Sequence, residues 1–268
     1  MQESNTSNNS SDIIRQWVTL AAVVLAFIVN VLSNIFPLNG LTIGGISNTL
    51  FGDVLIVPAN YAFAIWGLIY IGLFAFAIYQ VLPSQRENPN LRKAGYLLTI
   101  ASIAQCVWVY LFLSRYFAAS VVAMLWILIP LIIVYLRLGI GVRPASRGEK
   151  WFIRYPIGIY LGWISVATIV NIASALFINN WNGFGISPEN WTAIMVIIAT
   201  FIATLSLVQR QDFTYSGVTV WALIAIAIKQ WENANSNLKV VALSGVAILV
   251  AIGLFSQFNS RRTNDYRF

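Results

Sequence analysis

The chain has 268 residues, of which 59% are hydrophobic and only 9% are charged. An ordinary soluble domain carries about 25% charged residues, so the composition excludes a soluble globular fold and indicates an integral membrane protein. Histidine is absent and Cys106 is the one cysteine, which excludes an internal disulfide, a cysteine-cluster metal site and any chemistry that needs imidazole. The net charge of +7 does not indicate nucleic-acid binding, because the cations lie in loops between hydrophobic segments.

The hydrophobic segments are continuous rather than alternating in polarity, which indicates membrane-spanning helices and not a β-barrel. A window of about 19 residues predicts eight spans. The predicted spans are Trp17 to Phe36, Asn60 to Val81, Gly95 to Leu113, Ala118 to Leu136, Pro156 to Ile178, Trp191 to Val208, Ser216 to Gln230 and Leu238 to Phe258. We therefore predict an all-α integral membrane protein with eight transmembrane helices, flanked by a disordered polar tail (1–16) and a basic C-terminal tail (261–268).

The basic residues support this topology. Of the sixteen Lys and Arg residues, only Arg115, Lys229 and Lys239 fall on the side of the membrane opposite the N-terminus. Cytoplasmic loops hold the excess of Lys and Arg in multi-pass proteins. We therefore predict a multi-pass protein with both termini in the cytoplasm.

The first loop, from Pro37 to Val57, is unusually apolar and rich in glycine, and Asp53 is its only charged residue. Ordinary exposed loops are more polar. The loop is therefore expected to be either a partly buried connector at the membrane interface or a lid over a pocket between helices.

On the second predicted span, aromatic side chains and one glycine recur at steps of three and four residues and so share one helix face. These residues are Phe63, Trp66, Gly67, Tyr70 and Phe74. Such a face occurs in helix packing as well as in ligand sites, and the pattern alone leaves both interpretations open.

The third and fifth predicted spans carry comparable stripes. A buried amide in the third, Gln105, needs a hydrogen-bond partner in lipid. Aromatic rings with few polar groups are typical of a pocket for a large flat apolar molecule. The stripes consist of Gln105, Trp108, Val109 and Phe112 on the third span, and of Tyr160, Trp163, Ala167, Asn171 and Ser174 on the fifth.

Other features bear on partners and chemistry. Gly158 and Gly162 form a small-xxx-small pair, which allows close approach of another helix or dimerisation. The spans contain almost no ionisable residues, which disfavours ion-coupled transport. We see no acid, base, nucleophile or metal constellation, so we assign no catalytic residue and no metal ligand.

Three segments resemble the tryptophan-rich sensory proteins, or translocator proteins, which are related to the peripheral benzodiazepine receptor. The second span is similar to the family's proline-led helix, the third to its pattern N-x-x-W-x-x-L-F with glutamine in place of asparagine, and the fifth to Y-L-x-W-x-S-x-A-x-x-x-N. The matching residues are Pro58, Phe63, Trp66 and Tyr70; Gln105, Trp108, Leu111 and Phe112; and Tyr160, Leu161, Trp163, Ser165, Ala167 and Asn171.

The resemblance implies a five-helix translocator-like unit over 17–180, followed by three additional transmembrane helices over 181–260. Members of the family bind porphyrins and other flat apolar ligands, such as sterols, between the helices and under the first loop. Asn60 or Tyr61 lies where the family has a tryptophan, and Ile159 holds the position of a proline, so the mouth of the pocket departs from the family pattern. The implied ligand-binding residues are Asn60, Phe63, Trp66, Tyr70, Gln105, Trp108, Tyr160, Trp163, Ala167 and Asn171.

We therefore expect a membrane sensor or carrier that needs no cofactor and holds a porphyrin or a sterol-like molecule between its first five helices. The expected partners are the lipid bilayer and this small apolar ligand, without nucleic acid, while a homodimer stays open. The alternative is a membrane transporter or exporter of a small neutral solute. An enzyme that degrades a bound pigment with the help of Trp66 or Trp163, and a purely structural membrane protein, also stay open.

Overall fold

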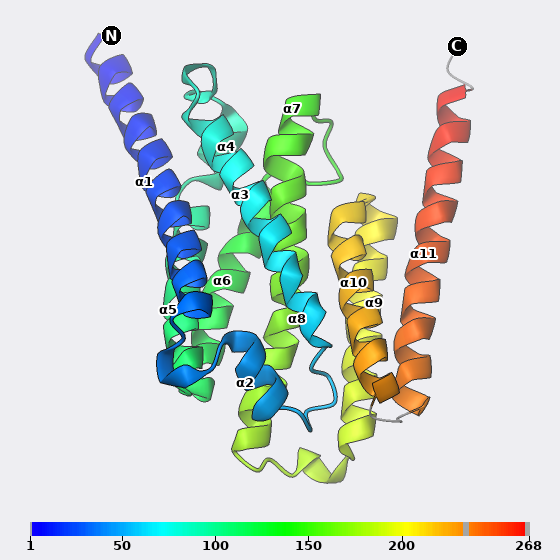
Figure 1. The fold of residues 1–268 in the computed structure, drawn as a ribbon. Helices are drawn as coiled ribbons and strands as arrows, with labels where there is room; N and C mark the ends of the chain where they lie inside the picture. Colours follow the sequence, from blue (N-terminus) through cyan, green and yellow to red (C-terminus); the bar gives the residue numbers. More distant parts are fainter. Residues whose placement is uncertain (1, 233–235, 266–268) are drawn as a thin grey trace.

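The computed structural model describes residues 2–232 and 236–265, and within these ranges all regular structure is helical (Figure 1). The long helices are α1 (Gln2–Ile35), α3 (Ile65–Val81), α5 (Leu97–Leu113), α6 (Phe117–Arg137), α8 (Tyr155–Ile178), α9 (Pro188–Arg210), α10 (Phe213–Glu232) and α11 (Ser236–Asp265). The connections contain the short helices α2 (Ile43–Thr49), α4 (Pro89–Ala94) and α7 (Arg147–Glu149), the 3₁₀ turns η1 (Leu38–Gly40), η2 (Asn60–Ala64), η3 (Pro83–Gln85) and η5 (Gly183–Gly185), and the π-helical turn η4 (Lys150–Arg154).

Each predicted span corresponds to one long helix. Among the residues that the structure describes, seven helices are long and apolar enough to cross a membrane, and the remaining span is α5 with 17 residues. The chain is therefore an all-α, multi-pass membrane protein, as predicted. Figure 1 shows that α1 begins and α11 ends at the same end of the bundle, as eight crossings require. The assignment of this end to the cytoplasm stays a prediction from charge.

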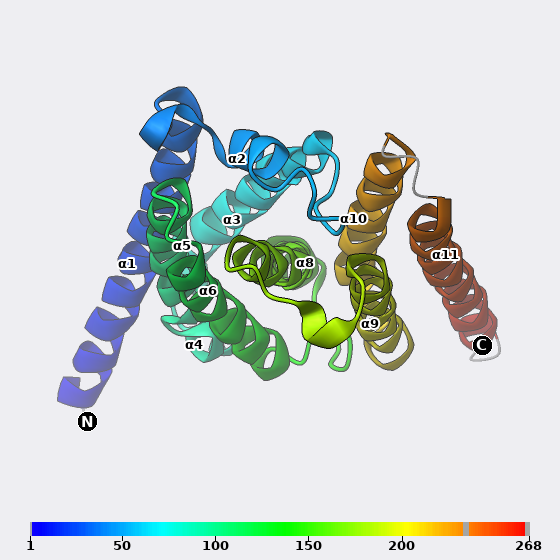
Figure 2. The same ribbon diagram turned by 90° about the horizontal axis from the view of Figure 1, so that it is seen from below.

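Helix α8 lies in the middle of the molecule (Figure 2). It packs against α6, α3 and α10, while α1 packs on α3 and α5 at one edge. At the other edge, α9, α10 and α11 pack on one another. The three C-terminal helices are thus attached to the first five mainly through the contact of α10 with α8.

Large apolar side chains fill the interior and also cover the outside of the bundle. Met124 and Ile127 of α6 are fully buried, whereas Trp126 between them is 61% exposed. Phe201 of α9 is likewise 61% exposed. A helix that is apolar on both faces is expected where lipid is the solvent.

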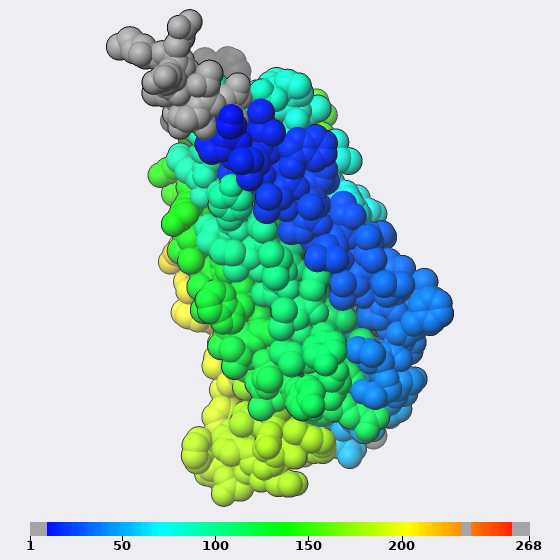
Figure 3. Space-filling view, turned by 90° about the vertical axis from the view of Figure 1, so that its left-hand side faces the viewer, coloured from blue at the N-terminus to red at the C-terminus, as the bar shows by residue number. Residues whose placement is uncertain are grey.

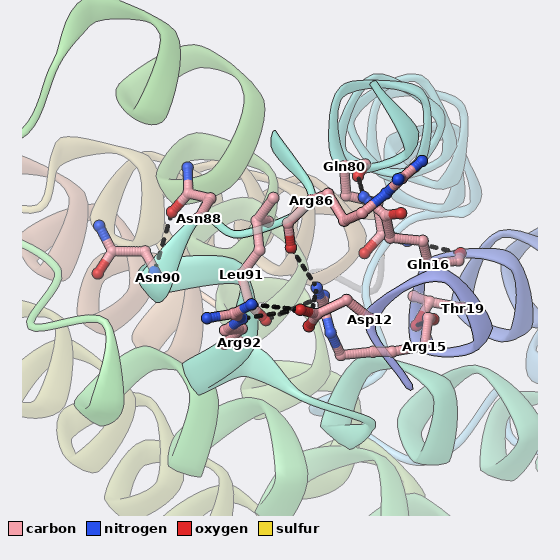
Figure 4. A network of polar contacts seen from close by, with 10 residues as sticks. All are labelled: Asp12, Arg15, Gln16, Thr19, Gln80, Arg86, Asn88, Asn90, Leu91 and Arg92. Atoms are coloured by element: carbon pink, nitrogen blue, oxygen red, sulfur yellow. Dashed lines mark hydrogen bonds and ion pairs between the residues drawn. The ribbon is translucent and has the colours of Figure 1, made fainter. Parts of the chain in front are cut away.

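The N-terminal segment is not the disordered tail that we predicted for residues 1–16, because α1 begins at Gln2. Figure 4 shows the polar contacts that Asp12, Arg15 and Gln16 of α1 make with neighbouring segments. The buried carboxylate of Asp12 accepts hydrogen bonds from Arg15, at 3.3 Å, and from the Nε atom of Arg92, at 2.9 Å. Asp12 thus belongs to the segment that composition marks as a solvated tail, but it is buried in a helix, because Arg92 of α4 supplies a partner for its carboxylate.

The first part of the basic C-terminal tail predicted for residues 261–268 lies within α11, which continues to Asp265. No glycine or proline interrupts the sequence from Ser256 to Asp265, so nothing in it ends the helix earlier. Residues 266–268 of this predicted tail lie outside the described residues.

The first loop is folded against the C-terminal helices. The side chain of Gln230 donates a hydrogen bond to the carbonyl oxygen of Leu55, at 2.5 Å, and the backbone N–H of Ala59 donates to the carbonyl oxygen of Ala225, at 3.0 Å. Gln230 and Ala225, which form these two hydrogen bonds with the loop region, both belong to α10. The loop is therefore a partly buried connector, and its helix α2 also covers the space between α3, α5 and α8.

Candidate functional site

Side chains from α2, α3, α5 and α8 surround a small cavity of about 40 Å³, which we call the aromatic chamber. Three tryptophans, each from a different helix, form most of its wall. The chamber is lined by Ile43, Ser47, Pro58, Phe63, Trp66, Trp108, Phe112, Trp163, Val166, Ala167, Val170, Asn171 and Ser174. It thus contains six of the ten residues that the sequence predicted for the ligand site: Phe63, Trp66, Trp108, Trp163, Ala167 and Asn171.

The rings of the chamber are positioned by contacts with one another. Trp108 stacks on Phe112 with a centroid distance of 5.2 Å. Phe63 meets Trp163 edge to face at 6.1 Å, which joins the start of the second span to α8. Aromatic pairs in such geometries stabilise each other by about 0.5–1.5 kcal/mol beyond the area that they bury.

One amide lies at the polar centre of the chamber. Asn171 on α8 is 3% exposed, and its side-chain oxygen accepts a hydrogen bond from the indole Nε1 of Trp108, at 2.8 Å. Its side-chain nitrogen donates to the Oγ atom of Ser120 on α6, at 2.9 Å. Because a buried amide in lipid must find partners, this network links α5, α6 and α8 at one level of the bundle.

Two of the remaining predicted residues lie behind the chamber wall instead of lining it. Tyr70 donates from its hydroxyl group to the carbonyl oxygen of Ala26 on α1, at 3.0 Å. Tyr160 is 1% exposed and meets Trp66 edge to face at 6.2 Å. Both tyrosines therefore support the ring of Trp66, which is the residue that faces the chamber.

Asn60 and Gln105 also lie outside the chamber lining. Asn60 is exposed at the start of η2, with its side-chain oxygen next to Gly44 of α2.

Gln105 is 1% exposed, and neither its side-chain nitrogen nor its oxygen has a hydrogen-bond partner among the described residues. The hydroxyl group of Ser102, one helical turn before Gln105, is also buried without a hydrogen-bond partner among the described residues. Leaving buried polar groups unpaired costs about 1–3 kcal/mol each, which makes this part of α5 a place for an additional hydrogen-bond partner.

Gly67, which shares the sequence pattern of the second span, is exposed, and a Cβ atom added there would meet nothing within 4 Å. It therefore leaves no gap in the wall of the chamber. Cys106 donates a weak hydrogen bond to the carbonyl oxygen of Ser102, at 3.4 Å, as expected for a small packing residue.

The volume of the chamber is far below the roughly 300–1,000 Å³ of typical ligand pockets. Its cover consists of Ile43 and Ser47 from α2, within the first loop, and of Pro58, which directly follows that loop. All three are buried. The structure thus shows a small chamber that the first loop and Pro58 cover on one side.

Two larger cavities, which no sequence pattern indicated, lie on the other side of α8, where it faces α9. One, of about 610 Å³, lies toward the first loop, and the other, of about 440 Å³, extends to Tyr135 and Arg210. Ile169 of α8 and Met195 of α9 line both. The sequence feature that could have indicated these cavities is the pair of tryptophans around the connection between α8 and α9, Trp181 and Trp191. No motif linked this pair to a binding site.

Within the described ranges, no group of three or more Cys, Asp or Glu residues is placed to hold a metal ion. The binding groups of the chamber are thus aromatic rings, one amide and hydroxyls. They suit burial and stacking of an apolar molecule with one or two hydrogen bonds.

Comparison with known proteins gives one match. A family model described as TSPO-like protein matches residues 16–255, which includes the three C-terminal helices as well as the first five. No curated protein and no solved structure matches the chain.

Proposed function

Because the chain belongs to the TSPO-like protein family, we propose that it binds a flat apolar molecule, a tetrapyrrole or a sterol-like compound, within the bilayer. The family assignment confirms the resemblance drawn from the three stripes. We propose the class of ligand, and a role in sensing or carrying it, in addition to this assignment.

The observation that carries the proposal is the aromatic chamber itself. Trp66, Trp108 and Trp163 come from three helices and surround the buried amide of Asn171 under a roof formed by the first loop. Flat rings present stacking surfaces, and the amide offers a second N–H group to fix the orientation of a ligand.

Binding requires the roof to move, since a cavity of about 40 Å³ holds little more than one water molecule. The roof is a short helix on a loop, with Thr42 capping its first turn through a hydrogen bond to the N–H of Gly45, at 3.0 Å. A ligand that buries about 400 Å² of apolar surface gains about 10 kcal/mol before association costs, which leaves micromolar affinity or weaker.

The test is a titration of the purified full-length protein with protoporphyrin, followed by tryptophan fluorescence. We expect saturable quenching in the micromolar range and about tenfold weaker binding for Trp163→Leu, because one stacking wall is lost. Trp126→Leu is the matched control, since Trp126 is a tryptophan of α6 that faces outward and is 61% exposed. Equal affinities of the two variants, or quenching that never saturates, would contradict the proposal.

A second candidate function, a transporter of a small neutral solute, is favoured by the two cavities between α8 and α9. They meet at Ile169 and Met195 and together extend from the first loop to Arg210 at the other end of α9. Flux of a neutral solute into proteoliposomes that Met195→Trp abolishes, without any effect on protoporphyrin quenching, would support this function over the first.

A further inference from the structure

The cavity of about 610 Å³ between α8 and α9, which we call the α8–α9 cavity, is distinct from the aromatic chamber. Its floor is an apolar strip from α8 and α9 that includes Ile169, Ile172, Leu176 and Met195. Its cap is formed by the loop segment 53–56 and by the turn that joins the two helices. Figure 3 shows this turn, in yellow-green, projecting at one end of the molecule, with the blue part of α1 toward the other end.

Two tryptophans of the cap are held in fixed positions. The indole Nε1 of Trp191 donates a hydrogen bond to the carbonyl oxygen of Gly183, at 2.8 Å. Gly183 has φ +65°, a conformation that favours glycine, and a Cβ atom there would lie 3.2 Å from the Trp191 ring. Trp181 meets Trp191 with a centroid distance of 5.3 Å. The turn is therefore built to present two indole rings to the cavity.

Asp53 is the one charged residue among the described residues that line this cavity. The segment that carries it is held on both sides. Phe51 is 1% exposed and packs edge to face on Phe117 at 4.8 Å, while Leu55 accepts a hydrogen bond from Gln230 on α10. In the part of the chain that the structure describes, no lysine or arginine forms a salt bridge with Asp53.

An exposed carboxylate and two indole rings line the same apolar cavity, and this combination of groups is the chemistry that recognises an organic ammonium group. We propose that the α8–α9 cavity binds a small apolar molecule that carries a protonated amine, with the ammonium group between Asp53 and the rings of Trp181 and Trp191. The apolar body lies along the strip on α8 and α9. The volume suits a molecule of drug size, and a phospholipid is disfavoured because Asp53 repels its phosphate and no cation lines the described part of the cavity.

The test compares two probes that differ in charge, pyrenemethylamine and pyrenemethanol, by energy transfer from tryptophan to pyrene. The purified full-length protein is titrated in uncharged dodecylmaltoside micelles, with empty micelles as background. We expect the amine to bind more tightly than the alcohol, and Asp53→Asn to weaken the amine about fivefold while changing the alcohol less than twofold. Glu189→Gln is the matched control, because Glu189 is an exposed acid in the first turn of α9 that does not line the cavity. It should change neither affinity.

Two further measurements test which cavity the probes occupy and whether a lipid competes for it. Because pyrene is itself a flat apolar molecule, this arm is run in an Ala167→Trp background, in which the added ring fills the aromatic chamber. In that background Ala173→Trp, which places a ring inside the α8–α9 cavity, should abolish binding of both probes. Equal affinity for amine and alcohol, amine binding that survives Ala173→Trp, or displacement of the amine by added phosphatidylethanolamine would each overturn the proposal. These outcomes are independent of protoporphyrin binding, so failure here is distinguishable from failure of the proposed function.

Discussion

Gly158 and Gly162 bring α10 against the central helix. A Cβ atom at Gly158 would lie 2.2 Å from the Oγ1 atom of Thr214, and one at Gly162 would lie 3.0 Å from the carbonyl oxygen of Tyr215. The small-xxx-small pair thus serves close packing of two helices of the same chain. While α10 covers it, this pair cannot mediate a homodimer, and a homodimer through another surface stays a prediction.

Gly158→Leu should therefore destabilise the protein by about 1–3 kcal/mol, because the added side chain forces α10 away from α8. Gly67→Leu is the control at an exposed glycine of α3, where an added Cβ atom meets nothing within 4 Å and helix propensity improves. The measurement is thermal unfolding of both variants in the same detergent. A Gly158→Leu protein as stable as Gly67→Leu would show that the contact of α10 with α8 is wrong.

At the scale of elements, the start of α1 depends on one buried ion-pair network. Asp12 and Arg15 are 6% and 5% exposed, whereas the side chain of Arg92 is 42% exposed. The carboxylate of Asp12 is thus the group that pairs with both Arg15 and Arg92. Removing it leaves the charge of Arg15 buried with less compensation.

Asp12→Asn is expected to lower the free energy of unfolding by about 2 kcal/mol, a value below that of a fully buried pair because Arg92 is partly solvated. Arg92→Gln should cost less than half of this. Limited proteolysis of the N-terminal segment gives a second readout, since Asp12→Asn should expose residues 2–16 to cleavage. If Arg92→Gln is the more damaging change, the network does not anchor α1 as described.

The spans were predictable from the sequence because lipid imposes continuous apolar helices, and the three stripes identified Trp66, Trp108, Trp163 and Asn171 correctly as neighbours. The sequence did not reveal that the predicted tail is helical, because Asp12 and Arg15 find partners on α4, about 80 positions away. It also placed Tyr70 in the ligand site, although that side chain turns to α1. Helical spacing fixes a face only to within about a third of the circumference, so adjacent helices decide which residues line a cavity.

At the scale of the whole molecule, α10 holds the chain on both sides of Pro58, which is part of the roof of the chamber. Trp221 of α10 donates a hydrogen bond to the carbonyl oxygen of Ala62, at 3.1 Å, and its ring meets Tyr61 edge to face at 5.0 Å. Together with the bonds to Leu55 and Ala59, these contacts tie the end of the first loop to α10. Opening of the chamber is thus coupled to α10, and the loop segment 53–56, which α10 holds through Gln230, also lines the α8–α9 cavity.

The central claim, that the chamber holds a flat apolar ligand, is tested most directly by mass spectrometry of the small molecules that copurify with the protein. Ala167→Trp fills the chamber, and Ala173→Trp, the same change on the same helix, fills the α8–α9 cavity instead. We predict that a flat apolar molecule copurifies with the wild type and with Ala173→Trp and is lost from Ala167→Trp. Identical profiles for the wild type and Ala167→Trp, containing only bulk phospholipid, would contradict the claim.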